Sequence, residues 1–167
     1  MGLDMFLISL PKIEGMDYDE VQMVNLDLSK LQAKQNEIYK KVEPYIKHFE
    51  EFGRSWTSLR EQVAYWRKAN QIHNWFVENL RNGEDEPCFI ELVTKDNLKD
   101  LYDLCMKILS DREEPSDILP TRPGCFFGSY DYDEYYYWQI EETRIMIAKL
   151  LETFNFETHY LMYECSW

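Results

Sequence analysis

The sequence predicts an α+β fold, with residues 1–167 forming a single globular domain in which four to five helices pack on a small β-sheet. Short apolar runs suited to strands lie near residues 3–9, 88–94 and 158–165. Longer stretches with helical periodicity separate them, the usual pattern of an α+β chain. The length suffices for one hydrophobic core, and the composition, 45% hydrophobic and 29% charged, is that of a globular protein.

The N-terminal third is expected to contain a strand, a loop and two helices. The run LDMFLIS forms the strand at 3–9, which Pro11 ends, and residues 12–27 show no clear period. From Ser29 the composition is helical. Pro44 cannot continue the helical hydrogen-bond ladder, so the helix should kink or restart there. A second short helix is expected over 44–53, with Gly53 beyond its end.

The strongest helical pattern covers residues 59–80. Ser58 and Glu61 have the spacing of a capping box, and Gly83 is suited to the helix end. On a helical wheel, Asn70 and His73 fall inside the apolar face and Trp75 points to the opposite side. That face is formed by Leu59, Val63, Trp66, Ala69, His73, Phe76, Val77 and Leu80.

The C-terminal half is predicted to be strand, helix, loop, helix and strand. Thr94 can cap a helix whose apolar positions are Leu98, Leu101, Tyr102, Cys105 and Ile108. Residues 114–129 contain three prolines and two glycines and read as a loop, a common place for function. Ser129 and Asp131 are both suitable caps for the next helix. Its apolar face is traced by Tyr136, Ile140, Thr143, Ile147, Leu150 and Phe154.

The charge of the chain limits its partners. The formal net charge is −13, so the surface should repel nucleic-acid phosphates and favour a basic protein; acidity can also serve solubility alone. No apolar run approaches the roughly 20 residues of a membrane helix. The N-terminus lacks a basic leader and the four cysteines are scattered, so a cytoplasmic protein with reduced thiols is expected.

The stretch YWRKANQIHNWF, residues 65–76, interleaves aromatic and basic side chains and is the first candidate ligand site. Trp66, Arg67, Asn70 and His73 can either bond within a core or face a cavity for a nucleotide-like ligand. The loop LPTRPGCFFGS offers three further ligand-binding candidates to the same site, namely Arg122, Phe127 and Ser129.

Two acidic clusters form a candidate partner surface. Residues 81–117 hold eleven acidic against five basic residues, and residues 131–142 hold five acidic residues and no basic one. Such clusters can imitate nucleic-acid phosphates in a basic groove, or merely form solvated faces and helix caps. Trp75 is either covered by another helix or an exposed anchor for a partner. The partner-binding candidates are Trp75, Glu84, Asp85, Glu86, Asp131, Asp133 and Glu134.

Searches for catalytic and metal-binding patterns give no candidate. His48, His73 and His159 are far apart, and neither a zinc-binding histidine pair nor a glycine-rich phosphate loop is present. A cysteine nucleophile needs a nearby histidine, which spacing alone does not reveal. The sequence therefore indicates no catalytic residue, metal or cofactor, and an enzyme is the less favoured class.

Several strings resemble small proteins of unknown function encoded by bacteriophages and prophages. They are MGLDMFL at the start, YWRKANQIHNWFVENL in the middle, and LPTRPGCFFGSYDYDEYY with the final YECSW. The resemblance covers the first few residues and roughly residues 60–167. It implies a setting, the bacterial cytoplasm during infection, and it transfers no catalytic residue.

The leading hypothesis is a phage-encoded, non-catalytic inhibitor of a bacterial defence protein. Its acidic loops and exposed aromatics would bind a basic surface that normally holds nucleic acid. The first alternative is a sponge that sequesters a nucleotide-like signal between aromatic and basic side chains. The second is a small hydrolase or transferase that uses the same cleft. The sponge pocket would be formed by Trp66, Arg67, His73, Arg122 and Phe127.

Overall fold

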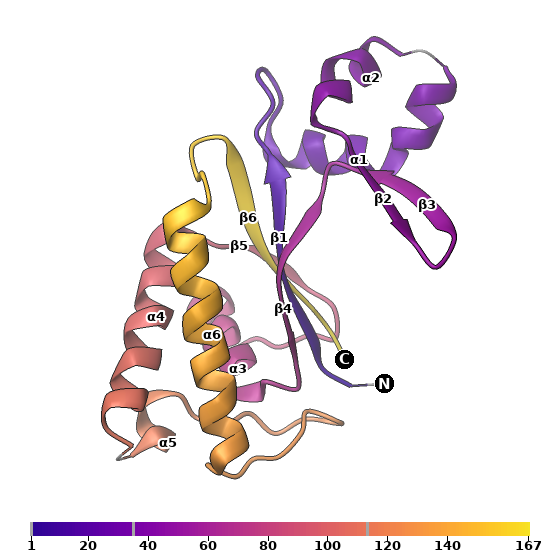
Figure 1. The fold of residues 1–167 in the computed structure, drawn as a ribbon. Helices are drawn as coiled ribbons and strands as arrows, with labels where there is room; N and C mark the ends of the chain where they lie inside the picture. The colour runs from indigo at the N-terminus through magenta and orange to yellow at the C-terminus, as the bar shows by residue number, and fades with distance from the viewer. Residues whose placement is uncertain (1, 35, 113) are drawn as a thin grey trace.

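The computed structural model describes residues 2–34, 36–112 and 114–167 and confirms the α+β class (Figure 1). The strands are β1 (Asp4–Pro11), β2 (Lys47–Glu51), β3 (Arg54–Ser58), β4 (Glu61–Arg67), β5 (Ile90–Leu92) and β6 (His159–Ser166). The helices are α1 (Tyr18–Ala33), α2 (Glu37–Val42), α3 (Asn70–Arg81), α4 (Lys95–Ser110), α5 (Pro115–Ile118) and α6 (Glu134–Thr153), with a 3₁₀ turn at Glu43–Tyr45. The described residues thus form six α-helices, where four to five were expected.

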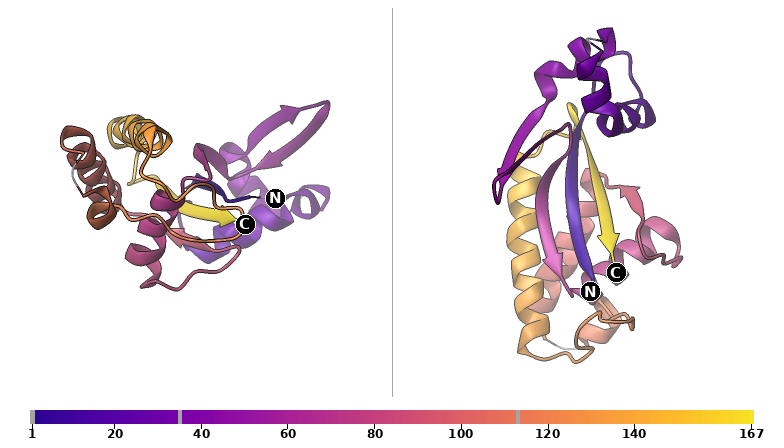
Figure 2. Two further views of the ribbon diagram at one scale, coloured as in Figure 1. Left: turned by 90° about the horizontal axis from the view of Figure 1, so that it is seen from below. Right: turned by 90° about the vertical axis from the view of Figure 1, so that its right-hand side faces the viewer.

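The main sheet has four antiparallel strands in the order β4-β1-β6-β5 (Figure 2). Its centre joins the two ends of the chain, because β1 pairs with β6 from Asp4 opposite Ser166 to Pro11 opposite His159. The strands expected near residues 3–9 and 158–165 are confirmed. The strand expected near 88–94 is also present but shorter, at Ile90–Leu92.

Each face of the sheet carries its own core. Leu7 and Tyr163 belong to the larger core, under α3, α4 and α6. Leu10 and Met162 belong to the smaller core, against α1 and Val42. Figure 2 shows α1 and α2 at one end of the sheet, away from the other helices. Because both faces of β1 are covered, its sequence is apolar at nearly every position instead of alternating.

The helix predicted over 59–80 is wrong in its first half. Residues Glu61–Arg67 form strand β4, and α3 begins only at Asn70. Ser58 does not cap a helix; its hydroxyl accepts the Arg60 N–H in the turn before β4. Pairing of β4 with β1 outweighs local helical propensity here, and Lys68, with φ of 58°, ends the strand.

Residues 12–58 also differ from the expectation. The predicted loop contains most of α1, which starts at Tyr18 behind an Asp17–Glu20 capping box. The short helix predicted over 44–53 is wrong, because residues 47–58 form the hairpin β2–β3. Phe52 and Gly53, with φ of 50° and 70°, make its tight turn.

The C-terminal helices follow their predicted periodicity. Leu98, Leu101, Cys105 and Ile108 are buried in α4, which Thr94 caps as expected. In α6 the predicted face is buried from Tyr136 to Leu150. The cap of α6 differs: neither Ser129 nor Asp131 occupies it. Asp133 does, and its carboxylate accepts the N–H groups of Tyr135 and Tyr136.

The Asp133 cap gives a direct test of this boundary. We expect Asp133→Ala to lower the free energy of unfolding by about 1 kcal/mol, because two helix N–H groups lose their acceptor. The matched control is Asp131→Ala, two residues earlier and outside α6, with an expected change within about 0.5 kcal/mol. Urea denaturation measures both, and equal losses would contradict the assignment.

Candidate functional site

The predicted ligand-binding residues separate into two groups in the structure. Trp66 and Arg67, at the end of β4, face α6: the Trp66 indole N–H donates to Thr143 Oγ1 at 2.9 Å, and the Gln139 amide donates to the Arg67 carbonyl at 3.3 Å. The second group joins the start of α3 to the loop after α5 and consists of Asn70, His73, Arg122, Phe127 and Ser129.

Asn70 holds the loop against α3. Its amide nitrogen donates to the carbonyls of Phe127 at 3.2 Å and Ser129 at 2.8 Å. Its amide oxygen accepts the Arg122 N–H at 3.2 Å. One buried side chain thus satisfies three backbone groups of a loop that has no regular structure between residues 119 and 133.

His73 lies between a hydroxyl group and a carboxylate. Its Nδ1 is 2.7 Å from the Tyr163 hydroxyl, and its Nε2 is 3.2 Å from both oxygens of Asp85. An ionised carboxylate only accepts, so Nε2 carries the proton and Nδ1 accepts from Tyr163. Burial lowers the pKa of His73, and the Asp85 carboxylate only partly opposes this effect. The imidazole is therefore neutral near pH 7.

Arg122 closes this network from the loop side. Its Nε donates to Asp85 at 2.9 Å, and one terminal nitrogen donates to Asn74 at 2.7 Å and Glu78 at 3.1 Å. The other terminal nitrogen donates to the Gly83 carbonyl at 3.1 Å. Four of the five guanidinium N–H groups thus bond to α3 and the loop after it, two of them to carboxylates, so Arg122 is not free to clamp an anion.

The centre of the group is a closed polar core. His73 is 0% exposed and Asn70 and Phe127 are each 1% exposed, while Trp66 is 4% exposed. Ser129 is exposed and joins the group through its backbone carbonyl. The order Tyr163–His73–Asp85 is that of a nucleophile, base and acid, but the Tyr163 ring stacks on Phe76 at 3.9 Å, and burial raises its pKa well above 10. The His73 and Tyr163 side chains are closed to solvent in this arrangement, where they bond to each other inside the core.

The predicted partner-binding residues are mostly at the surface. Glu84, Glu86, Asp131, Asp133 and Glu134 are exposed. The exception among the acids is Asp85, whose carboxylate is 15% exposed and paired with Arg122 and His73.

Trp75 is buried, so it is not the exposed anchor stated as one possibility for it. It is 6% exposed and its ring packs edge-on against Phe76 at 5.1 Å. The wheel misplaced it because α3 is enclosed on nearly all sides through Val77, not on one face. A buried indole offers no contact to a partner.

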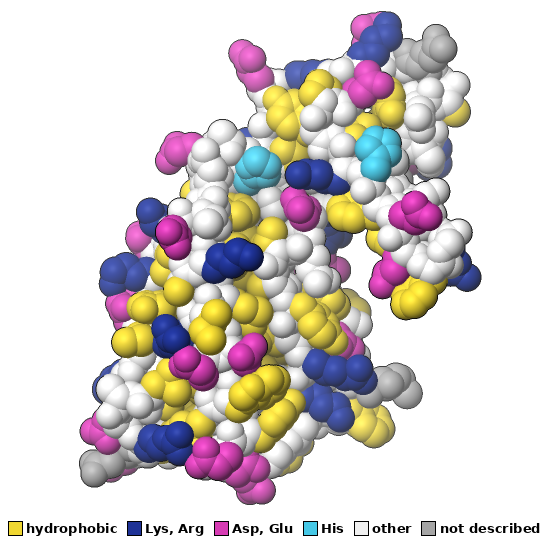
Figure 3. All heavy atoms as spheres, viewed as in Figure 1, with side chains coloured by type: hydrophobic (Ala, Val, Ile, Leu, Met, Phe, Trp, Pro, Cys, Tyr) yellow, Lys and Arg dark blue, Asp and Glu magenta, His cyan; other side chains and the backbone are white. Residues whose placement is uncertain are grey.

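A groove that sequence analysis missed lies between β4 and the N-terminal half of α6. It encloses a cavity of about 220 Å³. Tyr65, Tyr135 and Trp138 line it and are 41%, 47% and 55% exposed, and the rings of Tyr135 and Trp138 stack at 5.5 Å. Figure 3 shows hydrophobic and acidic side chains side by side on this face. The detectable signal was the i, i+3 spacing of Tyr135 and Trp138, off the buried face of α6.

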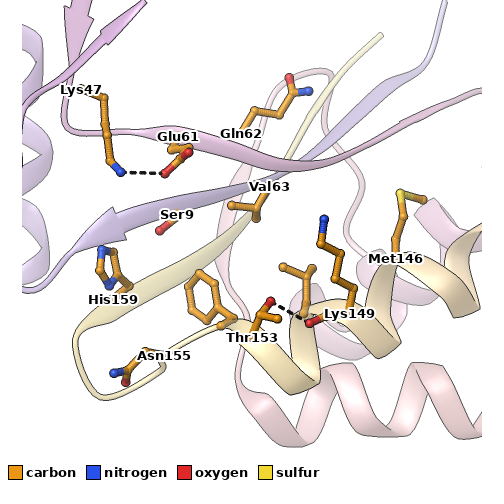
Figure 4. Close-up of a pocket in the computed structure, with 12 residues that line it drawn as sticks. Ser9, Lys47, Glu61, Gln62, Val63, Met146, Lys149, Thr153, Asn155 and His159 are labelled. Atoms are coloured by element: carbon orange, nitrogen blue, oxygen red, sulfur yellow. Dashed lines mark hydrogen bonds and ion pairs between the residues drawn. The ribbon is translucent and has the colours of Figure 1, made fainter.

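A larger cleft continues along the same strand toward the hairpin (Figure 4). It has a volume of about 590 Å³, and Met146 lines both cavities. On the strand side of the cleft, Lys47 of β2 pairs with Glu61 of β4 at 3.2 Å. Lys149 projects from α6 on the other side, as Figure 4 shows, and His159 lies at the end near Asn155.

The thiols offer no activated nucleophile among the buried cysteines. All four cysteines are free, with Cys88 and Cys125 exposed. Burial raises the pKa of Cys105 to about 12 and of Cys165 to about 11, so both are protonated thiols near neutral pH. Within residues 2–34, 36–112 and 114–167, no three His, Cys, Asp or Glu side chains are arranged to hold a metal ion.

Comparison with known proteins adds no family. No protein-family model, curated protein or solved structure matches the chain. In the part of the chain that the structure describes, no helix is both long and apolar enough to cross a bilayer. Fold and site therefore define an α+β protein with a closed polar core and an open groove beside β4.

The closed core makes a prediction about Arg122. We expect Arg122→Ala to lower the free energy of unfolding by about 1–3 kcal/mol. Asp85 would lose its charged donor and keep only His73, and the Gly83 carbonyl would lose the Arg122 donor. The control is Arg54→Ala on the exposed hairpin, with an expected change within about 0.5 kcal/mol. Chemical denaturation measures both. A loss for Arg122→Ala no larger than for the control would show that the network is not structural.

His73 predicts a pH dependence of stability. The pKa of His73 is lowered in the folded chain. As the pH falls below about 6.5, the folded state therefore binds fewer protons than the unfolded state does. Stability should therefore drop as the pH falls below about 6.5, and His73→Gln should flatten that drop. Burial also lowers the pKa of His159, which leaves a smaller slope of the same sign. His48→Gln, on exposed β2, should keep the full slope; an unchanged slope in His73→Gln would contradict the account.

Proposed function

We propose that the chain is a non-catalytic binding protein that captures a partner protein through exposed aromatic rings and acidic side chains. The observation that carries the proposal is the groove between β4 and α6, with the stacked rings of Tyr135 and Trp138 at its surface. Tyr65 lines its β4 side, where its ring packs on Phe6 and its hydroxyl donates to Asp4. Tyrosine and tryptophan are the side chains most enriched at binding hot spots. Stacking of Tyr135 on Trp138 holds two of them in place before binding, which reduces the entropy lost on association.

Acidic side chains surround these rings and set the chemistry of the partner. Asp131, Asp133 and Glu134 are exposed where α6 begins, and Glu142 lines the groove two turns further. Only Glu134 of these four has a basic partner among the described contacts, Arg112 at 2.8 Å. Together with a net charge of −13, this favours a basic surface, and complementary charge speeds its association.

The two alternative functions have less support. Both the nucleotide sponge and the hydrolase or transferase need His73 and Phe127 at the wall of a cleft, and these residues are 0% and 1% exposed. Arg67 lies instead on the groove beside α6, away from Arg122, which is bound to Asp85. The groove between β4 and α6 instead presents the exposed rings of Tyr135 and Trp138, which suit a protein partner.

The biological setting of the proposal comes from the resemblance to phage and prophage proteins. The resemblance implies a setting in the cytoplasm of an infected bacterium. A basic, nucleic-acid-binding defence protein there would have a charge complementary to that of the acidic chain. The chain would then act as an inhibitor that occupies the basic surface of such a protein.

Affinity capture tests the proposal. The immobilised chain should retain one protein from a bacterial host lysate at low salt, and less of it in about 1 M salt, where the Debye length is about 3 Å. Trp138→Ala should weaken retention by about 30-fold or more, the effect of losing a 2 kcal/mol hot spot.

The matched control is Phe52→Ala. It removes an aromatic ring that is 95% exposed at the tip of the β2–β3 hairpin and does not line the groove. It should leave retention unchanged. Capture of nothing at either salt concentration, or equal loss in both variants, contradicts the proposal. Steady conversion of a metabolite that is abolished in His73→Gln would instead favour an enzyme.

A further inference from the structure

Strand β4 forms one edge of the main sheet, and its outer backbone groups can be assigned. In the described chain it pairs only with β1. The Lys68 N–H donates to the Leu3 carbonyl, so by antiparallel alternation Trp66 also bonds to β1, whereas Tyr65 and Arg67 face outward. Gln139 already donates to the Arg67 carbonyl. The N–H and C=O of Tyr65 and the N–H of Arg67 remain for another strand.

Two neighbouring cavities lie beside this edge, with α6 as their opposite wall. They share Met146 as a lining residue, and their linings include residues of β4 from Glu61 to Arg67. An edge strand beside a helix is the arrangement in which extended peptides bind by strand addition, with main-chain hydrogen bonds giving affinity and side-chain pockets giving specificity.

The charges at the two ends of the groove differ. At the end near α1 and the hairpin, Lys149 has no acidic partner among the described residues, whereas Lys47 is paired with Glu61. At the other end Glu142 has no basic partner in the described contacts and lines the groove with Trp138, while Arg67, which lines the same end, is 4.0 Å from Asp4.

We propose that an extended segment of a partner protein adds to β4 as an antiparallel strand, with a basic side chain at Glu142 and Trp138 and, further toward its C-terminus, an acidic group at Lys149. This inference rests on the proposed function and names the form of the partner. We take the antiparallel direction because it is the more stable pairing per residue. Since β4 runs from the Lys149 end to the Glu142 end, an antiparallel segment has the order basic, apolar, acidic. The apolar position lies over Met146 and Val63, between the two charged ends.

The probe is a displayed library of random linear peptides of roughly ten residues, the upper length of common strands. Selection on the chain should enrich peptides with a basic residue N-terminal to an acidic one and apolar residues between them. Bound to the best peptide, the amides of Tyr65 and Arg67 should exchange with deuterium at least tenfold more slowly. The Trp66 amide, already bonded to β1, should change less.

Two pairs of variants separate strand addition from other modes of binding. Tyr65→Pro and Tyr65→Ala both remove the ring and its bond to Asp4, but only the proline also removes the outward N–H. Tyr65→Pro should therefore weaken peptide binding at least tenfold more than Tyr65→Ala. Lys149→Glu should weaken it at least tenfold, while Lys107→Glu, the same charge change on α4, should not. The helix-surface pair remains informative even if Tyr65→Pro fails to fold.

Three results overturn the inference: no peptide is enriched, bound peptides leave the Tyr65 and Arg67 amides unprotected, or those amides become protected without peptide as the protein concentration rises. The last result would mean that a second copy occupies the edge. Because lysate capture and amide exchange are separate readouts, retention of a partner with unprotected β4 amides rejects only strand addition. Strand addition without capture of a protein rejects only the proposed function.

Discussion

The antiparallel pairing of β1 with β6 is the interaction on which the rest of the structure depends. It joins residues near both ends of the chain, from Asp4 opposite Ser166 to Pro11 opposite His159. Both cores are built on these two strands, since Leu7 and Tyr163 face the larger one and Leu10 and Met162 the smaller. Pairs this distant in sequence carry a loop-closure cost that only burial on both faces offsets.

This central pair also determines where the chain can bind. With β1 and β6 inside the sheet, β4 and β5 are left at its edges. β5 is only three residues long, a common protection of an edge, whereas β4 has seven residues and lies beside a groove. The polar network around His73 and Arg122 contributes indirectly, because it fixes the loop that leads into Asp133 and α6.

The fold was predictable where local sequence and burial agree. The apolar runs of β1 and β6 and the periodicity of α4 and α6 were sufficient to predict the class and these elements. Strand β4 at residues 61–67 was not predictable, because these residues have helical spacing. Their pairing with β1, more than fifty residues away, stabilises a strand more than the local pattern favours a helix. The hairpin turn at Phe52 and Gly53 lacks the usual Asn-Gly signal, and it was missed for that reason.

The candidate site was predicted in part. The structure brings Asn70, His73, Arg122, Phe127 and Ser129 together, but it places Trp66 and Arg67, predicted for the same site, against α6. The sequence did not reveal that Asp85 and Tyr163 bond to His73 and close the core. The groove was missed because Tyr65 was assigned to a helix. Its outward position depends on the strand register, which follows from tertiary pairing and not from local pattern.

Photo-crosslinking in bacterial cells tests the central claim most directly, the claim that a partner protein lies on the groove between β4 and α6. A photoreactive phenylalanine analogue would replace Trp138 in one chain and Trp56, on the hairpin, in another; these side chains are 55% and 45% exposed. The account predicts one crosslinked protein from position 138 and none from position 56. Crosslinks from position 56 alone, or from neither position, would contradict it.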